Sequence, residues 1–163
     1  MAPGKREPRW LDDSQQHVWR AFLLGSTLLT DRIDDDLRRL HGISAVEYEI
    51  LVRLSEAGGQ LRMARLAAAL AHSRSRVTHT VKRMETAGLV QRGDSPDDGR
   101  GVIASITEPG RRLLVRAAPD HVETVRTYLV DIVEPDDFAA LGRVMDAVSD
   151  KLISEHPERE LRS

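Results

Sequence analysis

Residues 61–110 read LRMARLAAALAHSRSRVTHTVKRMETAGLVQRGDSPDDGRGVIASITEPG and decide the fold. The part from Met63 to Ala71 is rich in Ala and Leu, which favours a helix. After a short gap, Ser73 opens a second helix that continues to about Ala87. Two short helices joined by a tight turn are typical of a helix-turn-helix.

A β-hairpin is predicted directly after this motif. Gly88 ends the second helix, and residues 89–92 alternate between apolar and polar side chains as a strand does. Residues 93–101 carry the Gly, Asp, Ser and Pro residues of a polar turn, and residues 102–106 return as a second strand. A hairpin in this position is a wing.

Amphipathic helices are predicted before the motif. Ser14 offers an N-cap for a first helix that continues to about Leu40 and stops at Gly42. The sequence SAVE at 44–47 reads as a capping box, which starts a second helix that ends at Gly58.

Two more helices are predicted after the hairpin. Thr107 caps the first, which extends to about residue 133, and Pro119 is expected to kink or interrupt it. The last helix starts after Pro135 and extends to about residue 153. The apolar face of the first of these helices comprises Leu114, Ala118, Val122, Val125, Leu129 and Ile132.

The last helix carries a seam of apolar side chains at alternating spacings of three and four, which requires a partner helix. Long helices at both ends of a chain with a small central module leave surplus apolar surface, so we expect a homodimer. The predicted interface residues are Phe138, Leu141, Met145, Val148 and Leu152.

The net charge of −2 taken alone argues against a nucleic-acid partner. Residues 73–83, however, hold four basic residues and no acidic one, on the side of the second motif helix opposite to its apolar stripe. Arg can bind guanine edges, and hydroxyls and Lys can hold phosphates. The predicted DNA contacts are Ser73, Arg74, Ser75, Arg76, Thr78, His79, Lys82 and Arg83 in the helix, with Arg92 and Arg100 in the wing.

These motifs together resemble the core of the MarR family of bacterial regulators. The matching elements are Leu66-Ala67, Gly88-Leu89-Val90-x-Arg92, Asp98-x-Arg100 and Ile106-Thr107-x-x-Gly110. The resemblance implies a homodimer whose terminal helices form the dimerisation domain and whose two winged modules read a palindromic DNA operator. It also implies that Asp98 positions the wing.

Two positions depart from the family pattern. Arg62-Met63 stands where a Ser- or Thr-like cap is usual before the first motif helix, so that helix is expected to begin less rigidly. Gly99 stands where many relatives have a second basic residue, so the wing is expected to contact phosphate less strongly.

The expected fold is mainly α with a small β-hairpin wing, a winged helix-turn-helix flanked by N- and C-terminal dimerisation helices. Residues 1–13 are expected to form a flexible N-terminal arm, residues 14–43 and 107–163 the dimerisation helices, and residues 44–106 the DNA-binding domain. The expected function is sequence-specific transcriptional regulation by a homodimeric repressor of a palindromic operator.

The resemblance further implies release of DNA by a small aromatic or phenolic ligand in a cleft between the dimerisation helices and the winged module. Aromatic residues are few, and the expected ligand-binding residues are Trp19, Phe22, His41 and Tyr48. The alternative for Trp19 and Phe22 is a place in the core of the dimer.

Composition limits the other function classes. The chain has no cysteine, which excludes disulfides and thiolate chemistry, and it shows neither an apolar signal segment nor eighteen consecutive apolar residues. A cytoplasmic protein without membrane partner, cofactor or metal is therefore expected. Zinc binding is disfavoured because the six histidines have no close pair.

Two other functions, hydrolysis and protein binding, are alternatives to DNA binding. A hydrolase would need a nucleophile, a base and an orienting group, for which Ser73, His79 and Asp94 are available, but no nucleophile-elbow motif surrounds Ser73. A winged-helix module that binds protein instead of DNA would favour acidic or apolar residues on the second motif helix, and the basic start of that helix opposes this alternative.

Overall fold

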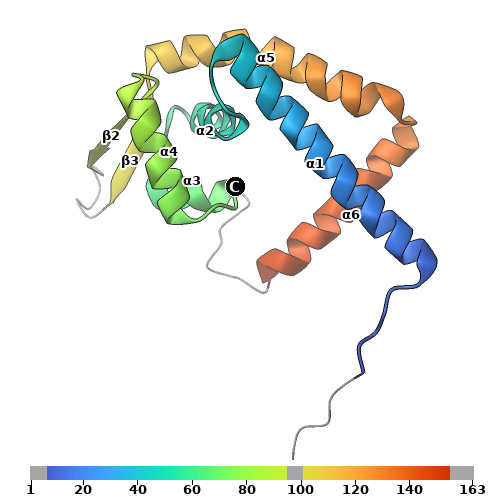
Figure 1. Ribbon diagram of the computed structural model, residues 1–163. Helices are drawn as coiled ribbons and strands as arrows, with labels where there is room; N and C mark the ends of the chain where they lie inside the picture. Colours follow the sequence, from blue (N-terminus) through green and yellow to red (C-terminus); the bar gives the residue numbers. More distant parts are fainter. Residues whose placement is uncertain (1–6, 95–100, 155–163) are drawn as a thin grey trace, which may run out of the picture.

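The computed structural model describes residues 7–94 and 101–154. Figure 1 shows a small module of helices and strands beside three long helices. In chain order the elements are α1 (Asp13–His41), α2 (Ala45–Glu56), β1 (Gln60–Arg62), α3 (Met63–Ala69), α4 (Arg74–Thr86), β2 (Val90–Asp94), β3 (Val102–Ile106), α5 (Glu108–Tyr128), the 3-10 helix η1 (Val130–Ile132) and α6 (Pro135–Ser154). The predicted mainly helical winged helix-turn-helix is confirmed.

The winged module, which comprises α2 to β3, is built around an apolar core. Leu54 of α2, Leu66 of α3 and Met84 of α4 are all fully or almost fully buried in it. The core continues into α5 through Leu113 and Ala117 and into the end of α1 through Leu37. Because these helices share one core, α4 has a defined place relative to α1 and α5.

A third strand was missed by the sequence analysis, which placed Leu61 in a connecting segment. β1 pairs antiparallel with β3, so that Leu61 lies opposite Ala104, and the strand order is β1-β3-β2. A three-residue strand is too short to show an alternating pattern, and its pairing partner lies some forty residues later, at about Ala104.

The N-terminus of α1 differs from the prediction by two residues. Asp12, not Ser14, is the N-cap: its carboxylate accepts a hydrogen bond from the Gln15 N–H at 2.8 Å, and the Gln15 side chain accepts one from the Asp12 N–H. Asp12 has a Gln three residues later and so forms a capping box, whereas Ser14 is followed at that spacing by His17. The C-terminal stop at Gly42 is confirmed, with a φ of +72°.

The N-termini of α2 and α3 agree with the sequence. Ser44 and Glu47 form the predicted capping box. α3 (Met63–Ala69), in contrast, has Arg62 at its N-cap position without a side-chain cap hydrogen bond, as the departure from the family pattern indicated.

α5 differs from the prediction in where it ends and in which face it buries. The helix continues through Pro119, which excludes the interruption but not the kink that was predicted there, and it ends at Tyr128 before η1. Its buried residues are Gly110, Leu113, Ala117 and Thr124, one position away from the predicted apolar face, which is half-buried or exposed. The face includes small and polar residues because the start of α5 lies close to Leu89. A Cβ on Gly110 would collide with the Leu89 carbonyl oxygen. Hydrophobicity alone therefore misplaces the face.

A buried carboxylate joins α1 to α5. Asp36 is only 8% exposed, and it accepts hydrogen bonds from Arg32 Nε at 2.8 Å, Arg39 Nη2 at 2.8 Å and Thr124 Oγ1 of α5 at 3.1 Å. The hydrogen bond from Arg39 is the main cause that lowers the pKa of Asp36 to about 2, with Arg32 and Thr124 adding to it against the opposing effect of burial.

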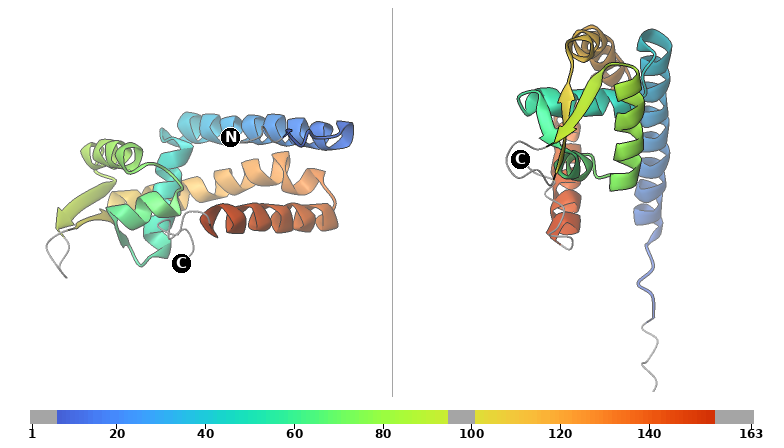
Figure 2. Two further views of the ribbon diagram at one scale, coloured as in Figure 1. Left: turned by 90° about the horizontal axis from the view of Figure 1, so that it is seen from below. Right: turned by 90° about the vertical axis from the view of Figure 1, so that its left-hand side faces the viewer.

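α1 and α5 both extend away from the winged module, and α6 runs back from the far end of α5 (Figures 1 and 2). Only Asp36 and Leu37 of α1 are buried, and no residue of α6 is. Within the described residues, no helix is long and apolar enough to cross a membrane.

The lowered pKa of Asp36 predicts an acid-dependent loss of stability. The carboxyl has an ordinary pKa of about 3.9 in the unfolded chain and a pKa of about 2 in the folded one, so its stabilisation is complete above pH 4 and is lost as the pH falls toward 2. Asp36→Asn should therefore lower the unfolding free energy at pH 6 and weaken the pH dependence of that free energy below pH 4. Urea titrations at pH 6 and below pH 4 measure both effects. Asp35→Asn, at an exposed neighbour, is the matched control. Equal pH dependence in Asp36→Asn and the unmodified chain would contradict this role.

Candidate nucleic-acid interface

α4 is an amphipathic helix with a sharply defined exposed face. Ser73 is its N-cap and accepts a hydrogen bond from the Arg76 N–H at 3.3 Å. Its buried stripe comprises Val77, Thr80, Val81 and Met84. The structure exposes every residue of this helix that the sequence predicted as a DNA contact: Ser73, Arg74, Ser75, Arg76, Thr78, His79, Lys82 and Arg83.

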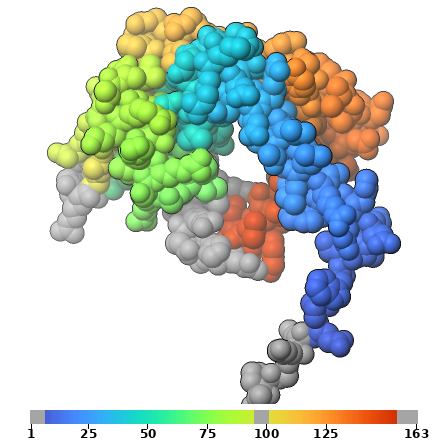
Figure 3. All heavy atoms as spheres, viewed as in Figure 1, coloured from blue at the N-terminus to red at the C-terminus, as the bar shows by residue number. Residues whose placement is uncertain are grey.

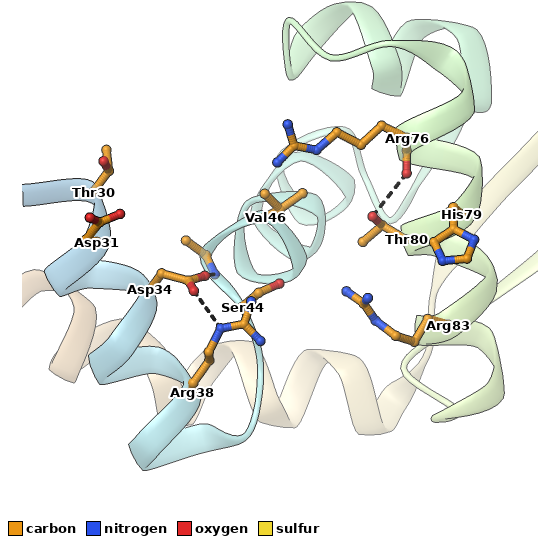
Figure 4. A pocket seen from close by; sticks show the side chains of 11 residues that line it. Thr30, Asp31, Asp34, Arg38, Ser44, Val46, Arg76, His79, Thr80 and Arg83 are labelled. Carbon is orange, nitrogen blue, oxygen red and sulfur yellow. Dashed lines mark hydrogen bonds and ion pairs between the residues drawn. The ribbon is translucent and has the colours of Figure 1, made fainter. Parts of the chain in front are cut away.

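These residues do not all point the same way. The helical spacing places Ser75, Thr78 and Lys82 opposite the buried stripe, facing away from the module. Arg76 and Arg83 lie on one flank, and Figure 4 shows both side chains directed toward α2 and α1. The outward set is therefore better placed for base edges than Arg76, which the sequence analysis had grouped with it.

Arg92 of the wing is engaged within the protein. Its Nε and Nη2 atoms donate to Glu85 Oε2 at 2.9 and 2.7 Å, and its backbone N–H donates to Glu85 Oε1 at 3.0 Å. The side-chain hydrogen bond from Arg92 is the main cause that lowers the pKa of Glu85. The structure thus places Arg92 as the link between β2 and the last turn of α4, not as a free cation at the wing. The predicted residues Asp98 and Arg100 lie outside the described residues.

Glu47 forms a second link to α4, which the sequence analysis recognised only as part of a capping box. Its carboxylate accepts from the Ser44 N–H and Oγ at 2.8 Å each, and from Arg83 Nε of α4 at 3.0 Å. Burial acts to raise the pKa of Glu47, but the hydrogen bonds from Ser44 and Arg83 outweigh it and leave the pKa lowered. A contact between residues so far apart in the chain leaves no local signal in the sequence.

A cleft of about 500 Å³ separates α4 from α1. Figure 3 shows the surface hollowed between these two helices, and Figure 4 shows the cleft from close by. At its floor, Asp34 of α1 accepts hydrogen bonds from the Ala45 N–H at 2.7 Å and from Arg38 Nε at 2.5 Å. The lining residues are Thr30, Asp31, Asp34, Arg38, Ser44, Ala45, Val46, Arg76, His79, Thr80 and Arg83.

The four predicted ligand-binding residues are not brought together in the protomer. Trp19 stacks on Phe22 with ring centroids 5.9 Å apart. The rings of Tyr48 and His121 pack with their centroids 4.6 Å apart. His41 Nε2 lies 2.8 Å from Asp120 Oδ2.

At 1.5 Å per residue, Trp19 lies about 33 Å along α1 from His41. None of the four lines the cleft between α1 and α4. The predicted location between the terminal helices and the winged module therefore holds a cleft, but a charged one with other residues.

The geometry offers no support for the enzymatic and metal-binding alternatives. Among the described residues, no hydrogen bond joins Ser73, His79 and Asp94, and the Ser73 hydroxyl oxygen serves as the cap of α4. Residues 7–94 and 101–154 contain no group of three His, Asp or Glu side chains placed to hold a metal ion.

A helix-turn-helix whose second helix exposes a polar face, followed by a β-hairpin, is typical of winged helix-turn-helix regulators. A model of the MarR family matches residues 41–101. The HTH-type transcriptional regulator PecS of Dickeya dadantii (strain 3937) is 32% identical over 123 residues, which cover 72% of this chain and 74% of PecS. The chain belongs to the MarR family of transcriptional regulators.

Solved structures agree with this assignment. AbsC, a MarR family transcriptional regulator from Streptomyces coelicolor, is 38% identical, with a TM-score of 0.85 over 90% of this chain and 99% of AbsC. A second MarR family regulator from the same organism, solved in complex with DNA, is 41% identical, with a TM-score of 0.89 over 96% of this chain and 99% of that one.

The pairing of Arg92 with Glu85 leads to a prediction that separates a structural role from DNA contact. Arg92→Ala should lower the unfolding free energy, because the ion pair in which Arg92 Nε and Nη2 donate to Glu85 Oε2 is lost. Glu85→Gln should have a similar effect. The salt dependence of DNA binding should keep its slope in Arg92→Ala, since no phosphate contact is removed. Unchanged stability with a slope reduced by about 1 per protomer would instead make Arg92 a phosphate ligand.

Proposed function

We propose that this chain is a homodimeric repressor that binds a palindromic operator, with α4 in the major groove and the wing at the adjacent minor groove. The observation that carries the proposal is the outward face of α4, where Ser75, Thr78 and Lys82 stand exposed while Val77, Val81 and Met84 are buried on the other side. Hydroxyl and ammonium groups at this spacing suit base edges and phosphates. The relative solved in complex with DNA, at 41% identity, supports DNA as the partner.

The proposal of a dimer is supported by apolar side chains that the protomer leaves uncovered on its terminal helices. On α1, half of the Trp19 side chain surface is exposed, and Val18, Phe22, Leu23 and Leu24 are exposed beside it. On α6 the exposed residues are Phe138, Leu141, Val144, Met145, Val148 and Leu152. A second copy would bury both sets and would set two α4 helices at a fixed separation. Trp19 and Phe22 fit this interface better than a ligand pocket.

For regulation we propose a small ligand, aromatic or phenolic with a polar group, in the cleft between α1 and α4. The cleft is bounded by a terminal helix on one side and by α4 on the other, so a ligand there would touch both. A ligand shifts the position of α4 only if it binds two positions of that helix with different affinity. Occupancy would then release DNA without covering the outward face of α4.

This function needs no catalysis. We propose that the chain acts by binding alone, in the cytoplasm where its DNA lies, because its relatives are regulators and its exposed polar side chains form no catalytic arrangement among the described residues. A protein-binding winged module has no observation in its favour.

Removal of Lys82 tests the proposal. The probes are a duplex that the unmodified protein selects from a randomised pool and a scrambled duplex of equal length. Lys82→Ala should weaken binding to both by about 1–2 kcal/mol and reduce the slope of log affinity against log salt by about 1 per protomer. Arg126→Ala, an equal charge change at the far end of α5, is the control and should leave both unchanged. An unmodified protein with no preference for the selected duplex would contradict the proposed function.

A further inference from the structure

We propose that Glu47 is a positioning residue for DNA recognition, which holds α4 at the angle that sequence reading requires through its ion pair with Arg83. The inference rests on the proposed function, because it assumes that α4 reads DNA. Glu47 touches no DNA in this account; it acts only through Arg83 and the N-terminus of α2.

The contacts of Glu47 leave its carboxylate one orientation. One oxygen, Oε2, accepts both hydrogen bonds from Ser44, and the other, Oε1, accepts from Arg83 Nε at 3.0 Å. The residue is 9% exposed, so a turn of the carboxylate away from Arg83 would leave a buried charge without its partner. The Arg83 side chain is more than half exposed, and Glu47 fixes the end that would otherwise move.

The apolar core sets the approximate place of α4, and an ion pair can restrict the small rotations that remain. Val81 and Met84 attach α4 to the core, but hydrophobic contact is non-directional and tolerates small rotations and shifts of a helix. A charge-assisted hydrogen bond is directional. Arg83 and Glu85 lie in the same turn of α4, so the contacts Arg83–Glu47 and Glu85–Arg92 fix that turn to α2 and to the wing.

The contact between Glu47 and Arg83 also connects α4 to the terminal helix α1. Asp34 of α1 accepts from the Ala45 N–H in the first turn of α2 at 2.7 Å, two residues before Glu47. α1, the start of α2 and α4 are therefore joined by successive polar contacts, from Asp34 to Ala45 and from Glu47 to Arg83. Figure 4 shows Asp34 and Arg83 on opposite sides of the cleft. A displacement of α1 would reach α4 through this route.

The sign of the effect distinguishes positioning from simple electrostatics. Replacing Glu47 with Gln removes a negative charge from a DNA-binding protein, which by charge alone should tighten binding to every duplex. Loss of positioning has the opposite effect, and only on the duplex whose bases are read. The ratio of affinities for the selected and the scrambled duplex is therefore the decisive quantity.

Glu47→Gln in the full chain should lower affinity for the selected duplex about tenfold, comparable to one lost base contact, while binding to the scrambled duplex stays equal or improves. Gln keeps an acceptor for Ser44 but not the charge that holds Arg83. Ser44→Ala is the matched control: it removes the hydroxyl that caps α2 and should lower the thermal midpoint by about 2–4 °C. The Ser44 N–H and Arg83 Nε still hold the two oxygens of the Glu47 carboxylate in this variant, so the affinity ratio should not change.

Arg83→Gln provides a second, exposed site at which the proposal can fail. It should reduce the affinity ratio by the same factor as Glu47→Gln, without a change in salt slope, and the double variant should lose no more than either single one. If the losses of the two single variants add up in the double variant, and the salt slope of DNA binding falls by about 1 in Arg83→Gln, then Arg83 binds phosphate directly. That result would overturn the proposal.

The remaining outcomes are also decisive. An affinity ratio unchanged in Glu47→Gln overturns the positioning role while the proposed function stands. An equal fall of the ratio in Ser44→Ala would mean that Glu47 acts only through stability, which also overturns it. An unmodified protein that does not distinguish the two duplexes overturns the proposed function and this inference together.

Discussion

Burial of a single stripe of α4 is the constraint on which the rest of the structure depends. Val77, Val81 and Met84 are covered by α2 and α3, and this contact determines which side of α4 faces outward. Since the stripe is apolar and the opposite side is polar, rotation of the helix would bury Lys82 or expose Met84. The outward face of α4 is therefore a consequence of the core, and the wing and the terminal helices are arranged around it.

Three carboxylates make directional contacts between elements, which the apolar core does not supply. Asp36 joins α1 to α5 by a hydrogen bond from Thr124, Glu47 joins α2 to α4 by one from Arg83, and Glu85 joins α4 to β2 by those from Arg92. Such pairs lend direction more than stability, because desolvation offsets much of their attraction. A net charge of −2 is compatible with DNA binding because the charges are unevenly distributed: residues 73–83 hold four basic residues and no acidic one.

Local patterns in the sequence were sufficient for the helices, the hairpin and the exposed face of α4. Errors arose wherever a residue is determined by a distant partner. β1 exists because β3 pairs with it, and the face that α5 buries is determined by the close approach at Gly110 and by the bond of Thr124 to Asp36. The pairing of Arg92 with Glu85 was not predicted, because Glu85 lies across a helix end, where no periodicity applies. The distance between Trp19 and His41 along α1 likewise does not follow from composition.

The measurement that tests the central claim most directly is a hydroxyl-radical footprint of the full chain on the duplex it selects from a randomised pool. A dimer that reads DNA through two α4 helices predicts two protected segments related by two-fold symmetry, centred about 10 bp apart on one face of the duplex. The same segments should be lost when salt is raised, because phosphate contacts supply much of the affinity. A single protected segment without symmetry, or uniform protection that does not depend on sequence, would contradict the account.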